Sequence, residues 1–379
     1  MPEKSYDIII VGAGVIGCAI AYELTKLGLR DILILDKGYP SGGATGRCGA
    51  GVRQQWGLEM NCRLAKDSVD IFEGLSEELG EDIEFEQGGY LVLAWDDETV
   101  ALYQRNLALQ NSLGIPVRLV NPTEAREIVP VLNIEGLAAA TYCPTDGHAN
   151  PFKTNFAYAR AAERGGATLK SFEEVLAIET DGDTKTVVTD KGRYQTKTVV
   201  NAAGGWATEI AELAGLPLDI YPERHQILIT EPYEPLFDPM VISFKHHLYC
   251  QQVVHGAFIM GLGLPEEPGF GVDSSWDFLE AAARAVTSLL PILSEVRVIR
   301  QWAGLYAMTP DGQPILGEDP RLSGFYHAAG FSGHGFMIAP ATAKLTAEAI
   351  ATGETPELIS SLDALRFERG ELVHEPNVV

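Results

Sequence analysis

The pattern of apolar residues near the start of the chain predicts two buried strands joined by a helix. Residues 7–11 form a short β-branched run typical of a buried parallel strand. A helical apolar pattern follows over residues 18–27, and a second buried strand is expected at residues 31–35. The turn between the first strand and the helix has the pattern GxGxxG, so the whole segment is a βαβ unit with the fingerprint of a dinucleotide site. The turn consists of Gly12, Ala13, Gly14, Val15, Ile16 and Gly17.

Each residue type in this fingerprint has a physical reason. Gly12 permits the tight turn, Gly14 lets the backbone approach a pyrophosphate, and Gly17 lets the helix pack on the strand. The helix N-terminus favours phosphate, and Asp36 at the end of the second strand can accept hydrogen bonds from a ribose. NAD and FAD both fit this unit. The small, hydroxyl-bearing loop at residues 41–47 favours an extended FAD.

The rest of the chain predicts further strands and helices. An apolar strand at 198–201 leads into small residues and then a helix at 207–214, and near the C-terminus a strand at 324–330 leads through the glycine-rich residues 331–336 into a helix at 337–351. Other helices are predicted at 64–79, 97–113, 151–164 and 276–289, with a capped helix start at 121–127, and strands at 89–94, 174–178 and 185–189.

This order of elements predicts a mixed fold of α/β and antiparallel β type. Residues 220–300 are dominated by strands that read as mostly antiparallel. We therefore expect a Rossmann-like FAD-binding domain with an inserted substrate domain built on a mostly antiparallel sheet. The expected FAD-binding domain is discontinuous, over residues 1–85, 145–215 and 305–379. The expected substrate domain covers residues 86–144 and 216–304.

Composition and charge exclude several classes of protein. The 379 residues include 28 basic and 52 acidic side chains, a net charge of −24. Such a balance argues against binding to nucleic acid or to anionic lipid. The five cysteines form no CxxC or Cys/His cluster, so we expect no metal site and a reducing, cytoplasmic location. The apolar stretch at 8–20 is interrupted by glycines and is too short to span a bilayer, so no transmembrane segment is expected.

Four segments together resemble the D-amino-acid oxidase superfamily of FAD enzymes, on its glycine oxidase and sarcosine oxidase branch. They are GAGVIG (12–17), VVNAAGGWA (199–207), WAGLYAMTPDGQPILG (302–317) and AAGFSGHGF (328–336). The β subunits of heteromeric L-proline dehydrogenases are the most similar group, through RCGAGVRQQW (47–56), PTDG (144–147), VISFK (241–245) and RFERGEL (366–372). The sarcosine oxidase β subunit is a more distant resemblance.

The resemblance implies an FAD enzyme that takes a hydride from the carbon next to an amino nitrogen. It places these residues around FAD: Gly12, Ala13, Gly14, Val15, Ile16, Gly17, Asp36, Lys37, Gly43, Ala44, Thr45, Arg47, Cys48, Gly49, Val175, Asn201, Ala202, Ala203, Gly204, Trp206, Gly304, Gly330, Phe331, Ser332, Gly333, His334, Gly335, Phe336 and Met337. In the glycine-rich loop, the backbone is expected to matter more than the His334 ring.

The substrate residues are also implied by the resemblance. Arg53 matches the arginine that grips the substrate carboxylate, and Tyr249 matches an active-site tyrosine. Tyr306 and Met337 stand where relatives carry a second cationic anchor. Arg53 could instead be a structural ion-pair residue, and Tyr249 a core tyrosine.

Three departures from the family pattern refine the expectation. Gly304 replaces a cysteine that bonds to FAD in monomeric sarcosine oxidase, so FAD should be non-covalent. Around Ile259 and Met260 the chain is aliphatic where that oxidase has a lysine that promotes oxygen reduction. Pro151 aligns with a histidine that carries FMN covalently in heterotetrameric sarcosine oxidase. A non-covalent FMN at an interface with an α-type partner subunit remains compatible with the sequence.

The function expected from these features is FAD-dependent dehydrogenation of L-proline, sarcosine or a similar secondary amine, with electrons passed to an acceptor other than O₂. Two alternatives stay open. One is an O₂-using oxidase of sarcosine, glycine or a D-amino acid. The other is an FAD electron-transfer subunit with a silent substrate pocket.

Overall fold

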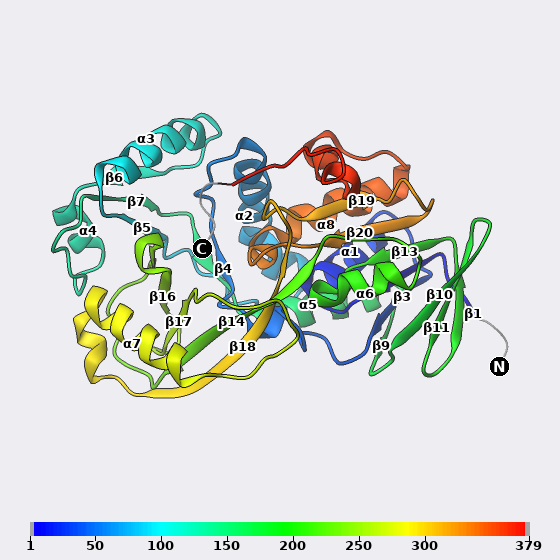
Figure 1. Ribbon diagram of the computed structural model, residues 1–379, viewed down its shortest axis with the longest axis horizontal. Coiled ribbons are helices and arrows are strands. Elements are labelled where there is room, and N and C mark those ends of the chain that lie inside the picture. Colours follow the sequence, from blue (N-terminus) through cyan, green and yellow to red (C-terminus); the bar gives the residue numbers. More distant parts are fainter. Residues whose placement is uncertain (1–3, 376–379) are drawn as a thin grey trace.

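A six-stranded sheet lies at the centre of the computed structural model, which describes residues 4–375 (Figure 1). Its strand order is β19-β20-β13-β2-β3-β9, and all neighbours are parallel except the edge pair β19–β20. The carboxyl ends of five strands therefore meet at one edge, where α/β folds bind their ligands. The strands are β2 (Ile8–Val11), β3 (Ile32–Asp36), β9 (Thr168–Ser171), β13 (Thr198–Asn201), β19 (Ile315–Glu318) and β20 (Phe325–Ala329).

Helices cover this sheet because their apolar faces share its core. Helix α1 packs against both α5 and α8, and α2 packs against α8. The buried face of α1 is nearly continuous and includes several small residues, which lets the helices approach closely. These helices are α1 (Val15–Lys26), α2 (Glu59–Leu79), α5 (Pro151–Arg164), α6 (Ala207–Glu212) and α8 (Gly335–Thr352).

A larger, eight-stranded sheet forms the other main part of the molecule. Its order is β18-β14-β17-β16-β15-β5-β7-β6, and only the β15–β5 pair is parallel. Helix α7 packs on this sheet through a separate apolar cluster. The elements are β5 (Tyr90–Ala94), α3 (Asp97–Ser112), β6 (Arg118–Val120), α4 (Pro122–Ile128), β7 (Ala139–Cys143), β14 (Tyr221–Thr230), β15 (Met240–Ser243), β16 (Leu248–Gln252), β17 (Phe258–Leu262), α7 (Trp276–Leu289) and β18 (Val298–Met308).

Two small sheets complete the described chain. The four-stranded sheet β1-β12-β11-β10 lies at the far end from α3 and α4 (Figure 1). The pair β4–β8 lies between the two main sheets. Their strands are β1 (Lys4–Ser5), β4 (Gly51–Val52), β8 (Gly147–His148), β10 (Val175–Asp181), β11 (Thr184–Thr189) and β12 (Arg193–Thr196). No helix within residues 4–375 combines the length and apolarity needed to cross a membrane.

The mixed architecture expected from the sequence is confirmed, but several helix starts were predicted too late. Helix α1 begins at Val15 rather than residue 18, α2 at Glu59 rather than 64, and α8 at Gly335 rather than 337. Helix α6 ends at Glu212, two residues before its predicted end. The starts of α1 and α8 lie inside the glycine-rich segments 12–17 and 331–336, and glycine is a poor helix former, so the local pattern favours a loop there. At the start of α2, the carboxylate of Glu375 accepts from the Gly57 and Leu58 amides at 2.8 and 3.1 Å.

Candidate active site

The turn after β2 has the geometry of a phosphate-binding turn. Gly12 has φ +114°, and a Cβ there would collide with the carbonyl of Ala202. A Cβ on Gly17 would collide with the carbonyl of Gly12. Both positions therefore require glycine for the close approach that the fingerprint predicts. Gly14 is the N-cap of α1 and has no side chain, so the helix end is left accessible to a ligand.

Two polar side chains fix this turn against its neighbours. The carboxylate of Asp36 accepts from the Ala13 amide at 2.7 Å and from the Gly38 amide at 2.7 Å. The hydroxyl of Thr45 accepts from the Val15 amide at 3.0 Å and so caps the start of α1 from a distant segment. A carboxylate has about four lone-pair sites, so Asp36 retains capacity for ribose hydroxyls. These residues fit the adenosine and pyrophosphate groups of FAD.

Other predicted FAD residues lie at the same sheet edge. Asn201 ends β13 and residues 202–204 follow it, while residues 330–334 follow β20. Strand β13 is the neighbour of β2 in the sheet, and β20 is one strand further away. Asn201 ties the turn after β13 by donating to the carbonyl of Ala207 at 2.7 Å. Lys37 lies over the ring of Trp206, with Nζ 3.9 Å from the centroid. The sheet therefore brings together groups that are widely separated in the sequence.

Val175 and Gly304 lie on other sheets, at places that still contact this edge. Val175 starts β10, two residues after Glu173, whose amide donates to the carbonyl of Asp36 at 2.9 Å. Gly304 lies on β18, and a Cβ there would come within 3.0 Å of the Cβ of Arg47. Arg47 in turn donates to the carbonyl of Ala303 at 2.8 Å. The segment after the 3₁₀ turn at residues 45–47 is thus fastened to the larger sheet.

The remaining predicted FAD residues form the loop around that 3₁₀ turn and the start of α8. Cys48 donates from Sγ to the carbonyl of Thr45 at 3.1 Å, and burial raises its pKa to about 12, which keeps the thiol protonated. Gly43 and Ala44 precede the turn, while Phe336 and Met337 lie in the first turn of α8. Phe336 is buried against the core, and Met337 is half-buried.

Arg53 is a buried cation between the two sheets. Its side chain is only 4% exposed, and its guanidinium carbon lies 4.0 Å from the ring centroid of Trp56 and 5.8 Å from that of Phe244. Burial lowers the pKa of Arg53, yet an arginine stays charged at any working pH. A charged fork held on an aromatic platform is suited to binding a carboxylate.

A buried acid holds the segment that carries Arg53. Asp146 accepts from the Gln54 amide at 2.8 Å and from Nε2 of Gln55 at 3.0 Å. Burial raises the pKa of Asp146 to about 6. Neither glutamine was singled out from the sequence, and Asp146 entered only as part of the PTDG resemblance. The arrangement fixes the backbone on both sides of the arginine.

The two predicted tyrosines lie close to one another on the larger sheet. Burial, and to a smaller degree the neighbouring Tyr306, raises the pKa of Tyr249 well above its ordinary value, and burial raises the pKa of Tyr306 to about 12. His225 stacks on Tyr306 with ring centroids 3.7 Å apart and planes at 12°. The same imidazole contacts Oε1 of Glu223 through Nε2 at 3.0 Å. Both phenols therefore stay protonated and can donate hydrogen bonds at neutral pH.

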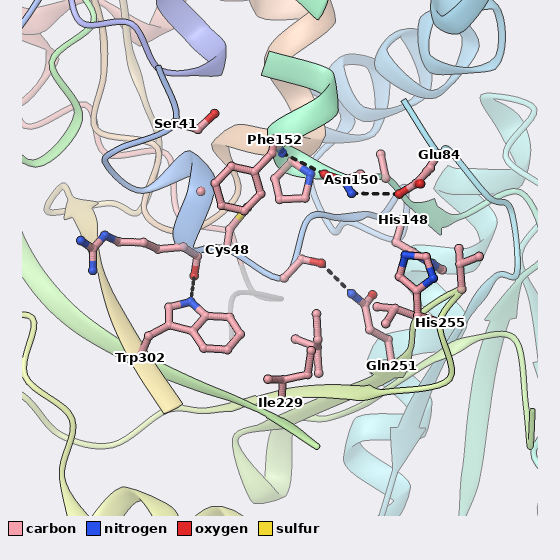
Figure 2. Close-up of a pocket in the computed structure, with 18 of the residues that line it drawn as sticks. Ser41, Cys48, Glu84, His148, Asn150, Phe152, Ile229, Gln251, His255 and Trp302 are labelled. Atoms are coloured by element: carbon pink, nitrogen blue, oxygen red, sulfur yellow. Dashed lines mark hydrogen bonds between the residues drawn. The ribbon is translucent and has the colours of Figure 1, made fainter. Parts of the chain in front are cut away.

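Residues 46–49 also line a cavity of about 410 Å³ (Figure 2). Gln251 points toward this segment and donates to the carbonyl of Gly49 at 2.6 Å, while Trp302 donates to the carbonyl of Arg47 at 3.0 Å. His148 and Gln251 each bury one polar atom, Nε2 and Oε1 respectively, that has no partner within residues 4–375. Such atoms indicate room for a polar ligand.

Part of the lining of this cavity was already named from the sequence, namely Arg47, Cys48, Gly49, Pro151 and Ile259, whereas His148 and Gln251 were missed. Tyr249 and Gln251 are two residues apart on β16, so their side chains share one face of the strand. On β17, Ile259 lines the cavity, whereas Met260 is buried in the core of the larger sheet. The position that replaces the oxidase lysine therefore reaches the cavity through Ile259 only.

The parallel sheet, its glycine turn and the acidic strand end define a dinucleotide-binding flavoprotein fold. Comparison with known proteins makes this specific. Residues 7–349 match the model of the DAO family, described as FAD dependent oxidoreductase, and the chain belongs to that family. It is an oxidoreductase, and its cofactor is FAD.

Relatives cover almost the whole chain. Sarcosine oxidase subunit beta of Rhodobacter capsulatus is 30% identical over 99% of this chain and 91% of its own. Glycine oxidase of Geobacillus kaustophilus is 30% identical over 92% of this chain and 94% of its own. The crystal structure of L-proline dehydrogenase from P. horikoshii has a TM-score of 0.94 and 41% identity, and covers 98% of this chain and 100% of that one. The resemblance seen in the sequence is thereby confirmed.

Proposed function

We propose that this chain dehydrogenates L-proline or a similar small secondary amino acid. The observation that carries the proposal is the buried guanidinium of Arg53, which lies on the ring of Trp56. The similarity to L-proline dehydrogenase and to sarcosine oxidase supports the class of substrate.

Arg53, Tyr249 and Tyr306 each have a separate role in the proposed reaction. Arg53 binds the substrate carboxylate, and this orients the carbon next to the nitrogen. Tyr249 and Tyr306 donate hydrogen bonds and exclude water from the reacting bond. Bound FAD supplies the acceptor for the hydride that leaves this carbon. The phosphate and ribose groups of FAD are held by the turn at residues 12–17, Thr45 and Asp36.

Removing Arg53 tests this assignment directly. Breaking a buried charged pair costs roughly 2–5 kcal/mol, so Arg53→Ala should lower kcat/KM about 30-fold or more. Arg53→Lys should recover only part of the activity, because its single ammonium cannot bind bidentately. Arg63→Ala is the matched control, since Arg63 is exposed and pairs only with Glu59 among the contacts described for it.

The assay combines anaerobic bleaching of the flavin with flavin content. L-proline, sarcosine, glycine and D-amino acids are added in turn to the purified holoprotein, and the loss of visible flavin absorbance is followed. FAD content should be equal in wild type and both Arg53 variants. Near-normal kcat/KM in Arg53→Ala would show that the arginine is structural. No bleaching by any amino acid would favour an electron-transfer subunit with a silent pocket.

The proposed electron acceptor is not O₂. The motivation is Ile259, an aliphatic residue at the cavity wall where an oxygen-activating lysine would be needed. Peroxide formation should be far slower than dye reduction with the same substrate. Equal rates would identify the protein as an oxidase. FAD is proposed to be non-covalent, because Gly304 offers no side chain for attachment, and acid precipitation should release the yellow colour into the supernatant.

We also propose that a partner subunit covers the cavity in Figure 2 and that FMN binds there non-covalently. The volume lies within the roughly 300–1,000 Å³ of ordinary ligand sites. Arg47 and Arg300 line it and suit a phosphate. Exposed apolar side chains at its rim include Phe152 at 46% and Val254 at 52%, which is typical of an interface. Free FMN should lose fluorescence when it is titrated into the complex of this chain with its partner subunit, purified from cells that express both at native levels. Gln251→Leu should weaken that binding. FMN-free complex with unchanged FAD would refute it.

A further inference from the structure

The side chain of His334 is buried without a hydrogen-bond partner. It is 4% exposed, and neither Nδ1 nor Nε2 has a partner among residues 4–375. Its backbone amide donates to the carbonyl of Phe331 at 2.9 Å, so the residue itself is firmly held. A neutral imidazole has one donor and one acceptor, and buried polar atoms in native proteins are nearly always satisfied. The ring therefore marks a place where a partner from outside the chain belongs.

The neighbours of His334 are the groups already assigned to the substrate. Its ring meets the edge of Trp56 at a centroid distance of 5.2 Å, and Arg53 lies 4.0 Å above the same indole. The preceding residue, Gly333, has φ +94°, and a Cβ there would collide with the ring of Tyr306. The imidazole is thus placed between the Arg53 platform and the loop that presses on Tyr306.

The charge around His334 favours an anion as the missing partner. Burial and the charge of Arg53 lower the pKa of His334 to about 4, so the ring is neutral at working pH. A neutral imidazole can donate one N–H without repelling Arg53. His334 is also the N-cap of α8, an 18-residue helix whose first amides and dipole favour negative charge. An arginine, a helix N-terminus and an unused N–H donor thus converge.

We propose that His334 is a substrate-binding residue whose imidazole N–H donates to the carboxylate that Arg53 grips. This rests on the proposed function, because it deepens the assignment of the same site. The imidazole thereby gives this carboxylate a second contact beside Arg53.

The test measures binding of an unreactive carboxylate as well as activity. Pyrrole-2-carboxylate, a planar analogue of proline, is titrated into the holoprotein, and its Kd is read from the change in visible flavin absorbance. His334→Phe keeps the volume and loses the N–H, so its Kd for this probe should rise about tenfold, the effect of one hydrogen bond to a charged group. KM for the substrate should rise similarly, with kcat nearly unchanged. His334→Asn should recover part of both.

Two controls separate binding from structure. His246 also meets a tryptophan edge-on, Trp95 at 5.1 Å, and His246→Phe should leave the Kd unchanged. Pyrrole-2-carboxamide keeps an acceptor oxygen but lacks the charge, so His334→Phe should weaken its binding less than that of the carboxylate. Equal weakening of both probes, loss of FAD from His334→Phe and His334→Asn, an unchanged Kd for the carboxylate, or a wild type that does not bind it would each overturn the proposal. Weaker carboxylate binding in a protein that no amino acid reduces would keep the His334 assignment and remove only the proposed reaction.

Discussion

A buried ion pair anchors the C-terminal segment, and its removal should cost more than that of any exposed pair. Arg366 is fully buried and reaches Asp311 with Nε at 2.8 Å and Nη2 at 2.9 Å. The same guanidinium donates to the carbonyls of Gln313, Leu362 and Asp363. Asp311→Ala would leave this cation buried without its counter-charge, which costs about 3–5 kcal/mol.

This free energy converts into a measurable melting shift. The entropy of unfolding is about 2.1 cal/mol/K per residue, which gives ~0.8 kcal/mol/K for a chain of 379 residues that unfolds as one unit. A loss of about 3–5 kcal/mol should therefore lower Tm by about 4–6 °C. The double variant Asp311→Ala/Arg366→Met should melt higher than Asp311→Ala, because it buries no lone charge. Arg369→Ala, which breaks a pair at 43% exposure, should shift Tm by about 1 °C or less.

Thermal melts of the FAD-loaded variants decide the matter, with flavin content measured in parallel. If Asp311→Ala melts within about 1 °C of wild type, the pair contributes nothing net and the carbonyls alone satisfy Arg366. If the double variant melts no higher than the single variant, the loss arises from packing and not from an uncompensated charge.

Three further outcomes are expected. Gly261→Ala should lower kcat/KM with little loss of stability, because its Cβ would lie 2.5 Å from the ring of Tyr249 and displace it. In the control Gly263→Ala the nearest atom to the new Cβ is 3.5 Å away, so this variant should behave as wild type. Equal kcat/KM in the two variants would contradict this. Burial raises the pKa of Asp146 to about 6. Its stabilising contribution is therefore complete below the ordinary pKa of 3.8 and is lost as the pH rises through 6. Asp146→Asn should flatten the fall in unfolding free energy between about pH 4 and 7, and an unchanged pH slope would refute the reasoning. Glu375→Gln should lower the unfolding free energy by about 1 kcal/mol of capping energy and therefore Tm by about 1 °C; an unchanged melting curve would contradict this.

The parts of the fold that local sequence determines were predicted well. The βαβ unit, the helix at 151–164 and the capping box at Asn121 depend on neighbouring residues, and all appear as expected. The start of α2 was missed because its capping carboxylate, Glu375, lies 318 residues from Gly57. No local pattern can reveal such a partner.

The candidate site shows the same division. The FAD edge follows from motifs at strand ends, because parallel strands bring their carboxyl ends together. The stack of His225 on Tyr306 depends on the register of β14 against β18, which pairs Glu223 with Tyr306 and His225 with Gly304. That register is set by contacts along the whole sheet, so the role of His225 could not be inferred from its position in the sequence. The domain boundaries and the roles assigned to the site residues stay predictions.

The spacing between the two sheets follows from a repeated pairing of tyrosine with glycine. Tyr90, Tyr249 and Tyr306 all come from the eight-stranded sheet. A Cβ on Gly51 would collide with the hydroxyl of Tyr90, and one on Gly333 would collide with the ring of Tyr306. A Cβ on Gly49 would come within 3.2 Å of the ring of Tyr249.

These glycines lie in segments that lead from the predicted FAD edge or form part of it. Because glycine has no side chain, the backbone there lies directly against the tyrosine rings. Backbone at these positions cannot move away by a change of rotamer, as a side chain could. The positions of these three tyrosines against the neighbouring backbone are therefore set by the fold, and substitution of the facing glycines would displace the rings.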